Sequence, residues 1–384
     1  MKKTILTLTL FLSLNLYTQN QQNEKSKDSI TALDEVIIKA NTILGNKFVA
    51  KNRTGAAYYL STEELAKFNY TDINRALNKI SGINFYEEDG FGLRPNISIR
   101  GTSPERSSKI AIMEDGILIS PAPYSASSAY YFPSIARMQA VEVLKGSSQI
   151  QYGPYTTGGA INFVSTEIPE SFNGKISSSY GSFKTGQTHL TLGNSSNKFG
   201  YMFEYLNYNS DGFKTLANNL NTGFDINEIT SKIRFQLSKK RKIKQNLELK
   251  FHHYDEISNE TYLGLSENDF EKNPFLRYPG SEKDKMDAEH IQFLVTHELN
   301  FNERFKITTN AYYNGFKRNW YKLDDVVFEG SSQKISKIIS NSQNYAGHIS
   351  ILKGLSDSEN ALKVKANNRE YVSKGVQTKI DYHW

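Results

Sequence analysis

The sequence contains no cysteine among its 384 residues. This absence excludes a disulfide, a thiolate metal site, a cysteine nucleophile and the lipidated cysteine of a lipoprotein. An excess of one charge is also missing, because 46 Lys and Arg are set against 40 Asp and Glu. A scattered surplus of this size gives no basis for binding nucleic acid, which requires a basic face or stripe. Beyond the first residues, no apolar run reaches the roughly 20 residues that a membrane-spanning helix needs.

The N-terminus has the pattern of an export signal. Two lysines precede an apolar stretch at residues 5–16, and this charge and length are typical of a secretory signal peptide. We therefore interpret residues 1–19 as a signal peptide; the stretch is too short for a transmembrane anchor. The polar residues that follow have no periodicity, and we predict a flexible linker over residues 20–40. An exported chain without helical spans is soluble, periplasmic, secreted or a β-barrel.

Residues 41–168 combine helix and strand signals within the size of one domain. Ser61 and Glu64 have the spacing of a capping box and predict the start of a helix, and residues 73–80 predict a second helix. The sequence Glu114-Asp115-Gly116 separates two β-prone runs and indicates a hairpin. We therefore predict a compact α+β domain. Further short strands are predicted at 83–85, 97–100 and 140–144.

Residues 169–384 show long segments with a period of two, in which apolar side chains alternate with polar ones. Such segments place one face in apolar surroundings and the other in water. Short turns alternate with a long loop at 256–288, as in outer-membrane barrels, and the 23 Tyr and 22 Phe suit the aromatic girdles of such barrels. A soluble β-sandwich is the alternative, although it would have shorter strands and more even loops. The alternating segments are 229–238, 246–252, 291–301 and 305–313.

The length of this second region limits what it can enclose. It has room for nine or ten strands, whereas a barrel with a plugged lumen needs about 22. We therefore expect the chain to hold only the first part of a membrane β-barrel and to be truncated at its C-terminus, and such a fragment is not expected to function alone.

Several motifs, in their order along the chain, resemble the TonB-dependent outer-membrane receptor family. The motifs are LDEVIIKA at 33–40, NISIRG at 96–101, VEVLKG at 141–146, YGP at 152–154 and GGAINF at 158–163. Within the family, the sequence resembles the ferric-dicitrate type, through Ala122-Pro123-Tyr124, the loop around residues 262–278 and the segment Lys317-Arg318-Asn319-Trp320. The match extends from about residue 33 to the C-terminus.

This resemblance implies a plug domain over residues 41–168 inside a barrel that begins at residue 169. It implies a location in the cell outer membrane, in contact with its lipid, and import of a ferric siderophore driven by TonB and its inner-membrane proton-driven motor. It implies no enzyme activity and no bound cofactor, since the ferric chelate is the transported ligand. Residues 33–40 resemble the TonB box of the family, which would pair with a TonB strand by edge addition; alternatively, they are the first strand of the next domain. The contact residues of the TonB box would be Leu33, Asp34, Glu35, Val36, Ile37 and Ile38.

The resemblance also implies candidate site residues. Ferric citrate is rich in carboxylates, which guanidinium groups and lysines bind well; the alternative for each cation is an ordinary solvated loop charge. The family pattern implies that Arg100 and Glu142 form ion pairs between plug and barrel. His252 and His253 point to opposite faces of a strand, so we predict no metal site. The predicted ligand-binding residues are Arg106, Tyr124, Arg277, Lys285, Lys317 and Arg318, with Tyr130 and Tyr131 near the plug apex.

Other functions stay open at this point. A different siderophore, haem or cobalamin would be compatible with the same architecture. A secreted β-rich adhesin belongs to another class and would need no plug.

Overall fold

The structure is a computed structural model that describes residues 41–382, apart from short gaps at 68, 126–127, 218, 239–242, 260–262 and 303. The described residues belong to one compact unit, Ile38–Trp384. The predicted signal peptide, linker and TonB box lie outside the described residues.

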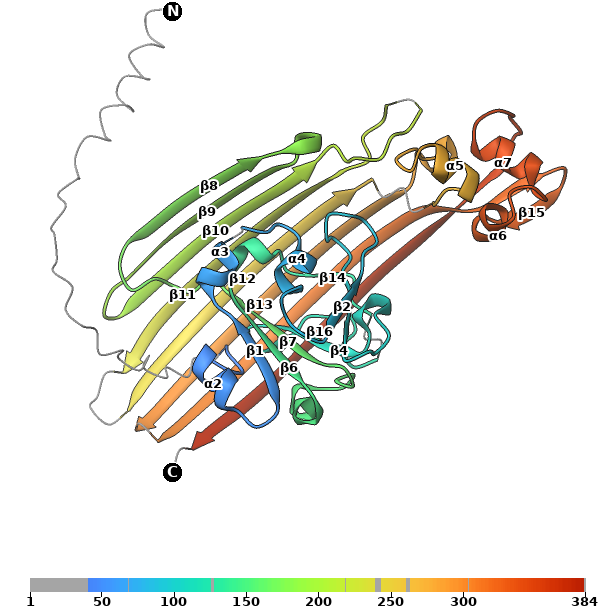
Figure 1. Cartoon of the computed structure of the whole chain (residues 1–384). Coiled ribbons are helices and arrows are strands. Elements are labelled where there is room, and N and C mark those ends of the chain that lie inside the picture. The colour runs from blue at the N-terminus through green and yellow to red at the C-terminus, as the bar shows by residue number, and fades with distance from the viewer. Residues whose placement is uncertain are drawn as a thin grey trace, which may run out of the picture. The chain divides into compact units, whose positions relative to one another are not determined.

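The first part of this unit is a plug with a five-stranded sheet in the order β1-β6-β7-β4-β5 (Figure 1). Strands β4 and β7 pair in parallel, and the other neighbours are antiparallel. The strands are β1 (Ala56–Leu60), β4 (Ile110–Glu114), β5 (Ile117–Leu118), β6 (Met138–Lys145) and β7 (Gly159–Ser165), with a separate hairpin of β2 (Ile83–Tyr86) and β3 (Asn96–Ile99). The helices are α2 (Lys47–Asn52), α3 (Thr62–Ala66) and α4 (Ile73–Leu77).

Local signals explain most of these elements. The capping box of Ser61 and Glu64 is present and begins α3. Helix α4 begins after Asp72, as predicted, but it ends at Leu77 because the next turn tightens to a bond from the Ile80 N–H to the Leu77 carbonyl. The sequence did not predict β7, since all its residues are buried and a strand covered on both faces shows no alternation.

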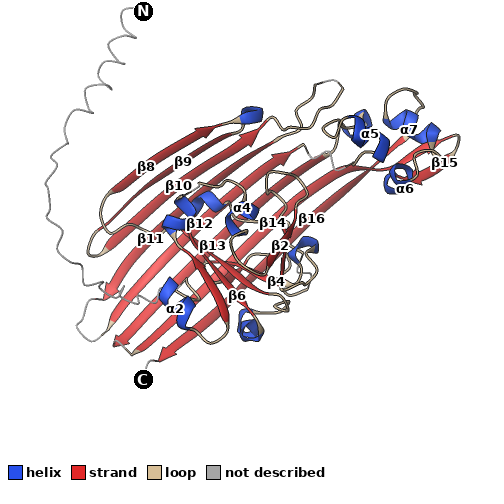
Figure 2. Cartoon of the chain, in the orientation of Figure 1, coloured by secondary structure: helices blue, strands red, loops and turns tan. Residues whose placement is uncertain are grey.

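The second part is a sheet of nine strands, β8 to β16, and each pairing in it is antiparallel (Figure 2). The prediction of nine or ten strands is confirmed. The first strands are β8 (Asn173–Tyr180), β9 (Gly186–Ser195), β10 (Phe199–Ser210), β11 (Phe224–Ser238) and β12 (Lys244–Ser258). They are followed by β13 (Lys285–Asn302), β14 (Phe305–Phe328), β15 (Ser331–Lys334) and β16 (Leu362–Tyr382).

The two faces of this sheet differ as the alternation predicted. On β11, Ile229 and Ile233 are 37% and 38% exposed, whereas Thr230 and Lys232 are 0% and 1% exposed. The buried face lies against the plug, and one hydrophobic core joins plug residues such as Ile112 to sheet residues of the buried face. Along the alternating segment of β11 the sheet therefore presents polar side chains to the plug and apolar ones to the outside, while apolar residues elsewhere on the buried face join the core.

The connections at one end of the sheet are short, and the two longest connections at the other end pack together (Figure 1). The segments 259–284 and 329–361 contain α5 (Glu267–Lys272), α6 (Ile335–Ser340) and α7 (Ala346–Leu352), and they share a hydrophobic core. Lys353 of one segment forms an ion pair with Asp269 of the other at 2.8 Å. The two loops therefore pack as one body. Within the part of the chain that the structure describes, no helix has the length and apolarity to cross a membrane.

Candidate functional site

A cluster of buried charges joins the plug to the centre of the sheet. Arg137 ends a short 3-10 helix, Ile135–Arg137, directly before β6. Glu114 ends β4, and Asp115 follows it in the turn to β5. The two terminal nitrogens of Arg137 donate to the Glu114 carboxylate at 2.6 and 2.9 Å. Its Nε donates to Glu228 of β11 at 2.5 Å, so one guanidinium binds a carboxylate from each part of the fold.

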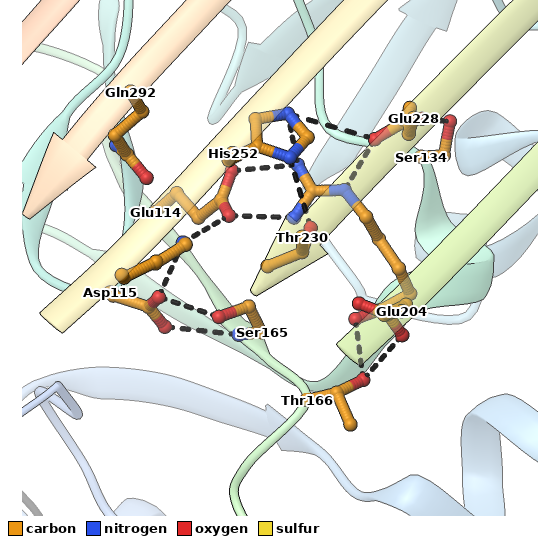
Figure 3. Close-up of polar contacts among 12 residues, drawn as sticks. Glu114, Asp115, Ser134, Ser165, Thr166, Glu204, Glu228, Thr230, His252 and Gln292 are labelled. Carbon is orange, nitrogen blue, oxygen red and sulfur yellow. Dashed lines mark hydrogen bonds and ion pairs between the residues drawn. The ribbon is translucent and has the colours of Figure 1, made fainter. Parts of the chain in front are cut away.

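Two lysines from the sheet complete this arrangement. Lys250 of β12 donates to Glu114 at 2.6 Å and to Asp115 at 2.7 Å, and Lys232 of β11 lies 3.9 Å from Asp115. We call the six residues Glu114, Asp115, Arg137, Glu228, Lys232 and Lys250 the central charge cluster. It balances three carboxylates with three cations, all at most 4% exposed. Because an unpaired buried charge is costly, the plug and the sheet stabilise each other's charges. Figure 3 shows the carboxylates of Glu114, Asp115 and Glu228 converging here.

The plug carboxylates of this cluster stay ionised. Burial by itself would raise the pKa of Glu114, but the positive charges of Arg137 and Lys250 outweigh it and hold that pKa well below its usual value. Burial likewise opposes ionisation of Asp115, and Lys250 and Lys232 lower its pKa. The two carboxylates that the plug contributes to the interface are therefore ionised at neutral pH.

Further contacts surround the central charge cluster. Arg94 of the plug binds Glu256 of β12 through both terminal nitrogens, at 3.0 and 2.5 Å. The hydroxyl of Tyr131 hydrogen-bonds to His252 at 3.0 Å, and the Tyr131 ring stacks on His290 with 4.0 Å between centroids. These contacts hold the plug on several neighbouring strands.

A second group of residues lies where the plug meets the inner face of β14, and we call it the arginine–aromatic site. It consists of Arg106 and Tyr130 of the plug and Arg318, Trp320 and Lys322 of β14. The guanidinium of Arg318 lies 3.5 Å from the centre of the Tyr130 ring, and Arg106 lies 5.2 Å from the Trp320 ring. The Lys322 ammonium is 4.3 Å from the same Trp320 ring.

The charges of this site favour an anion. Arg318 is 5% exposed, and its Nε and Nη1 have no hydrogen-bond partner among the described residues. Across the strand pair, Arg318 faces Arg369 and Lys322 faces Lys365. Like charges directly opposite each other repel, so a ligand that brings carboxylates would relieve the repulsion and occupy the free guanidinium donors.

The structure separates the predicted ligand residues. Arg106 and Arg318 lie in the arginine–aromatic site, although Arg106 also binds Glu88 at 2.6 and 2.9 Å. Lys317 points to the opposite face of β14 from Arg318 and lies 3.8 Å from Glu370. Lys285 begins β13 with its side chain 3.8 Å from Asp287. Neither lysine therefore joins the site.

The two remaining ligand predictions lie elsewhere in the plug and the loops. Tyr124 is 61% exposed and its hydroxyl lies 3.2 Å from that of Tyr312. Arg277 donates to the carbonyl groups of Pro274 and Leu276 in its own loop, at 2.9 and 2.6 Å. Tyr130 and Tyr131 both lie against the inner face of the sheet.

The proposed ion pairing of Arg100 and Glu142 needs correction. Arg100 is exposed in a turn with φ of +56°, and among the described residues no sheet carboxylate pairs with it. Glu142 is buried within the plug, where its carboxylate accepts backbone N–H groups of Ile43, Leu44 and Gly45. The link between plug and sheet is instead made by Arg137 and Arg94. Among the described residues, the Glu142 carboxylate bonds to Asn162 and to backbone groups of the plug and not to the nine-stranded sheet.

The alternating segments contain a partial signal for the residues of the central charge cluster. Lys232 and Lys250 stood on the polar faces of alternating segments, where burial would require a partner charge. Arg137 and Glu228 had no such signal, because their separation of 91 residues hides the pairing. His252 and His253 do point to opposite faces, with His252 0% exposed. No group of three potential ligands is placed to hold a metal ion among the described residues.

Comparisons with known proteins agree with this architecture. Residues 50–160 match the family model described as the TonB-dependent receptor plug domain. The fold is similar to a crystal structure of the unliganded ferric citrate transporter FecA, with a TM-score of 0.60 and 23% identity over 73% of this chain. It is also similar to the ferric yersiniabactin uptake receptor FyuA from Yersinia pestis, with a TM-score of 0.59 and 15% identity over 71% of this chain.

A third similar structure is the open form of the ferric-catecholate import receptor Fiu from E. coli K12, with a TM-score of 0.59 and 16% identity over 85% of this chain. The chain spans less than half the length of these proteins: 42% of FecA, 42% of FyuA and 46% of Fiu. The described residues therefore have the plug-and-sheet fold of TonB-dependent siderophore receptors. The names of the three proteins describe a transporter, an uptake receptor and an import receptor, each for a ferric chelate.

Proposed function

We propose that this chain is the plug and the first barrel strands of an outer-membrane receptor that imports a ferric siderophore with energy from TonB. The observation that carries the proposal is the ionic attachment of the plug to the polar face of a sheet whose apolar face is exposed. An exposed apolar face suits lipid, and a plug held by ion pairs obstructs the space inside the sheet. In this proposal residues 1–19 direct export, 41–168 form the plug and 169–384 belong to the barrel.

We infer that residues 33–40 form the TonB box, that residues 33–38 contact TonB, and that this segment receives the pull that opens the path. A short β-prone run between polar segments suits strand addition to a partner sheet. Since the outer membrane has no ATP, transport of a scarce solute across it depends on such a connection to the inner membrane.

The cargo that the arginine–aromatic site suits best is ferric citrate. Its carboxylates match the free donors of Arg318 and the surrounding positive charge. The likeness to the ferric citrate transporter FecA, at 23% identity, points in the same direction. A catecholate or phenolate chelate is the alternative within the class, because the likeness to Fiu and FyuA covers a similar share of the chain.

Deletion of residues 33–38 tests the energy coupling. Cells that carry the deleted receptor are expected to bind radioactive ferric chelate at the surface but to accumulate none. The matched control deletes residues 22–27, an equally long part of the linker, and is expected to transport normally. Uptake that persists without residues 33–38 would refute the proposal.

The cargo needs a separate experiment. Iron-restricted cells that depend on this receptor are supplied with one chelate at a time: ferric citrate, a catecholate, a phenolate, haem or cobalamin. We expect growth on ferric citrate. Growth on another chelate alone would keep the transport proposal and reject citrate.

A further inference from the structure

The segment directly after the proposed TonB box is held by one buried carboxylate. Glu142, which is 0% exposed, accepts the backbone N–H groups of Ile43, Leu44 and Gly45, each at 2.8 Å. Three consecutive N–H groups that converge on an anion form a nest, and Gly45 closes it with a φ of +82°. The positive φ suits glycine. A pull on residues 33–40 reaches this nest before it reaches any strand of the plug.

Asn162 connects the nest to the turn that carries the central charge cluster. It lies beside Glu142 across the β6–β7 pair and is 0% exposed. Its Nδ2 donates to Glu142 at 2.7 Å and to the Asn41 carbonyl at 3.1 Å. Its Oδ1 accepts the backbone N–H of Gly116 at 2.8 Å. One amide therefore bonds to the N-terminal segment, to the nest carboxylate and to the β4–β5 turn.

The same turn is attached to the sheet. Asp115, next to Gly116, has a φ of +51° and binds Ser165 through backbone and side chain at 3.0 and 2.6 Å. Its carboxylate also accepts from Lys250 of β12 at 2.7 Å. A continuous series of hydrogen bonds thus extends from residues 41–45, through Glu142, Asn162 and the Gly116 turn, to the inner face of the sheet.

We propose that Glu142 and Asn162 transmit the pull on the N-terminal segment to the Asp115–Lys250 contact, so that releasing the nest loosens the attachment of the plug to the sheet. This inference rests on the proposed function for its purpose, and it assigns positioning roles to two residues buried in the plug. Burial suits this series of hydrogen bonds to transmitting a pull. Charge-assisted hydrogen bonds are about twice as strong as neutral ones, and water does not compete for buried bonds.

Hydrogen–deuterium exchange of the purified whole chain tests the series without TonB or chelate. Glu142→Gln is expected to speed exchange in peptides covering 41–47 by at least about tenfold, because it removes bonds to a charged acceptor. It is also expected to speed exchange at 111–118, the segment that contains the turn. A double variant combines Glu142→Gln with Asn162→Ala. Its exchange at 111–118 should be no faster than in whichever of the two single variants exchanges faster, since both changes break the same series.

The matched control is Asp89→Asn, which removes another plug carboxylate that accepts three backbone N–H groups, those of Phe91, Leu93 and Arg94, but stands outside the series. It should leave 41–47 and 111–118 unchanged. Should Glu142→Gln not fold, Asn162→Ser keeps Glu142 and its three donors, and it should speed exchange at 111–118 while 41–44 stays protected. The proposal would be overturned if Glu142→Gln and Asn162→Ala had additive effects on exchange at 111–118. An unchanged exchange rate at 111–118 in Glu142→Gln would overturn it as well.

Pulling on single molecules gives a second readout. The chain has no cysteine, so Ile38→Cys supplies a unique thiol for attachment. Glu142→Gln is expected to lower the force of the first rupture to about half, and Asp89→Asn to leave it unchanged. Equal first forces in the wild type and Glu142→Gln would show that the nest does not bear the load. Neither assay contains TonB or cargo. The roles of Glu142 and Asn162 can therefore be refuted while the import experiment supports the proposed function, and the reverse is also possible.

Discussion

Arg137 of the plug and Glu228 of β11 are joined at 2.5 Å with both side chains almost fully buried, at 0% and 1% exposure. The same guanidinium holds Glu114, and the hydroxyl of Ser134 also donates to Glu228. Removing Arg137 would therefore leave two carboxylates buried without their main partner. Breaking such a pair costs more than the pair contributes, which suits an attachment that is firm until it is released.

Replacing Arg137 by methionine is expected to lower the free energy of unfolding of the plug by about 3–5 kcal/mol. The measurement is denaturant unfolding followed by the fluorescence of Trp320, which lies at the plug–sheet contact beside Tyr130. The other tryptophan, Trp384, is first changed to phenylalanine so that the signal has one source.

The matched control is Arg75→Met. Arg75 also lies near two carboxylates, Asp72 and Glu87, but at 3.7 Å and with 59% exposure. An exposed pair of this kind contributes little, so the change should stay within about 0.5 kcal/mol. Equal losses for the two variants would contradict a special role for Arg137.

The fold of the sheet follows from its alternating pattern, but the partners of its polar face do not. The pattern predicted which face of β11 and β12 would carry Lys232 and Lys250, and the structure confirms it. It did not reveal that these lysines meet Asp115, because alternation specifies a face and not what covers that face. These pairings between plug and sheet arise only when the plug docks.

The same reasoning explains the mixed outcome for the ligand residues. Arg318 and Lys317 were both chosen as cations near the end of a strand. Extending the alternation of 305–313 to residue 320 would have placed Lys317 on the outer face beside Tyr313 and Arg318 on the inner one. The burial of Arg318 against Tyr130 depends on where the plug apex lies, which no local pattern contains.

This pair of neighbours gives the sharpest prediction about cargo. Arg318→Ala is expected to weaken ferric citrate binding by at least about tenfold, because it removes charge-assisted bonds worth about 1.5–3 kcal/mol. Arg318→Lys should recover only part of the affinity, since an ammonium lacks the planar fork that matches a carboxylate. Binding is measured by quenching of intrinsic fluorescence in purified receptor.

Lys317→Ala is the control for that experiment, on the same strand and with the same formal charge change. Its side chain is 61% exposed on the outer face, so binding should be unchanged. A loss of affinity that is as large for Lys317→Ala as for Arg318→Ala would show that overall charge, and not the arginine–aromatic site, attracts the chelate.

The junction between the two long loops should depend on pH. Burial opposes ionisation of Asp269, but hydrogen bonds from Lys353, Tyr278 and Ser266 outweigh it and lower the pKa of Asp269 from 3.8 to about 2. A carboxyl with a lowered pKa stabilises the fold above its unfolded pKa and loses that contribution as the pH falls through the folded pKa. The loops should thus stay closed at pH 5 and loosen between about pH 4 and 2.

Limited digestion with pepsin measures this loosening as the rate of cleavage within 259–284. Asp269→Asn cannot ionise, so its loops should be cut faster at pH 4 and should show a weaker dependence on pH between 4 and 2. Asp357→Asn, a change of the same kind in the exposed segment after α7, is the control and should behave as the wild type. Identical pH profiles for Asp269→Asn and the wild type would exclude Asp269 as the titrating group.

The apolar outer face provides the test that separates a membrane barrel from a soluble β-protein. Phe293 is at the middle of β13, is 50% exposed, and lies between Phe251 and Tyr313 at 5.1 and 6.4 Å. In a bilayer, Phe293→Lys should cost about 2–4 kcal/mol of folding free energy, whereas Phe293→Leu should cost far less. In water the order of the two variants reverses, because a lysine on an exposed apolar patch improves solubility.

Folding into lipid vesicles, followed by heat-modifiable gel migration, measures the difference between Phe293→Lys and Phe293→Leu. If Phe293→Lys folds as well as Phe293→Leu and stays soluble without detergent, this face does not meet lipid, and the receptor proposal fails with it.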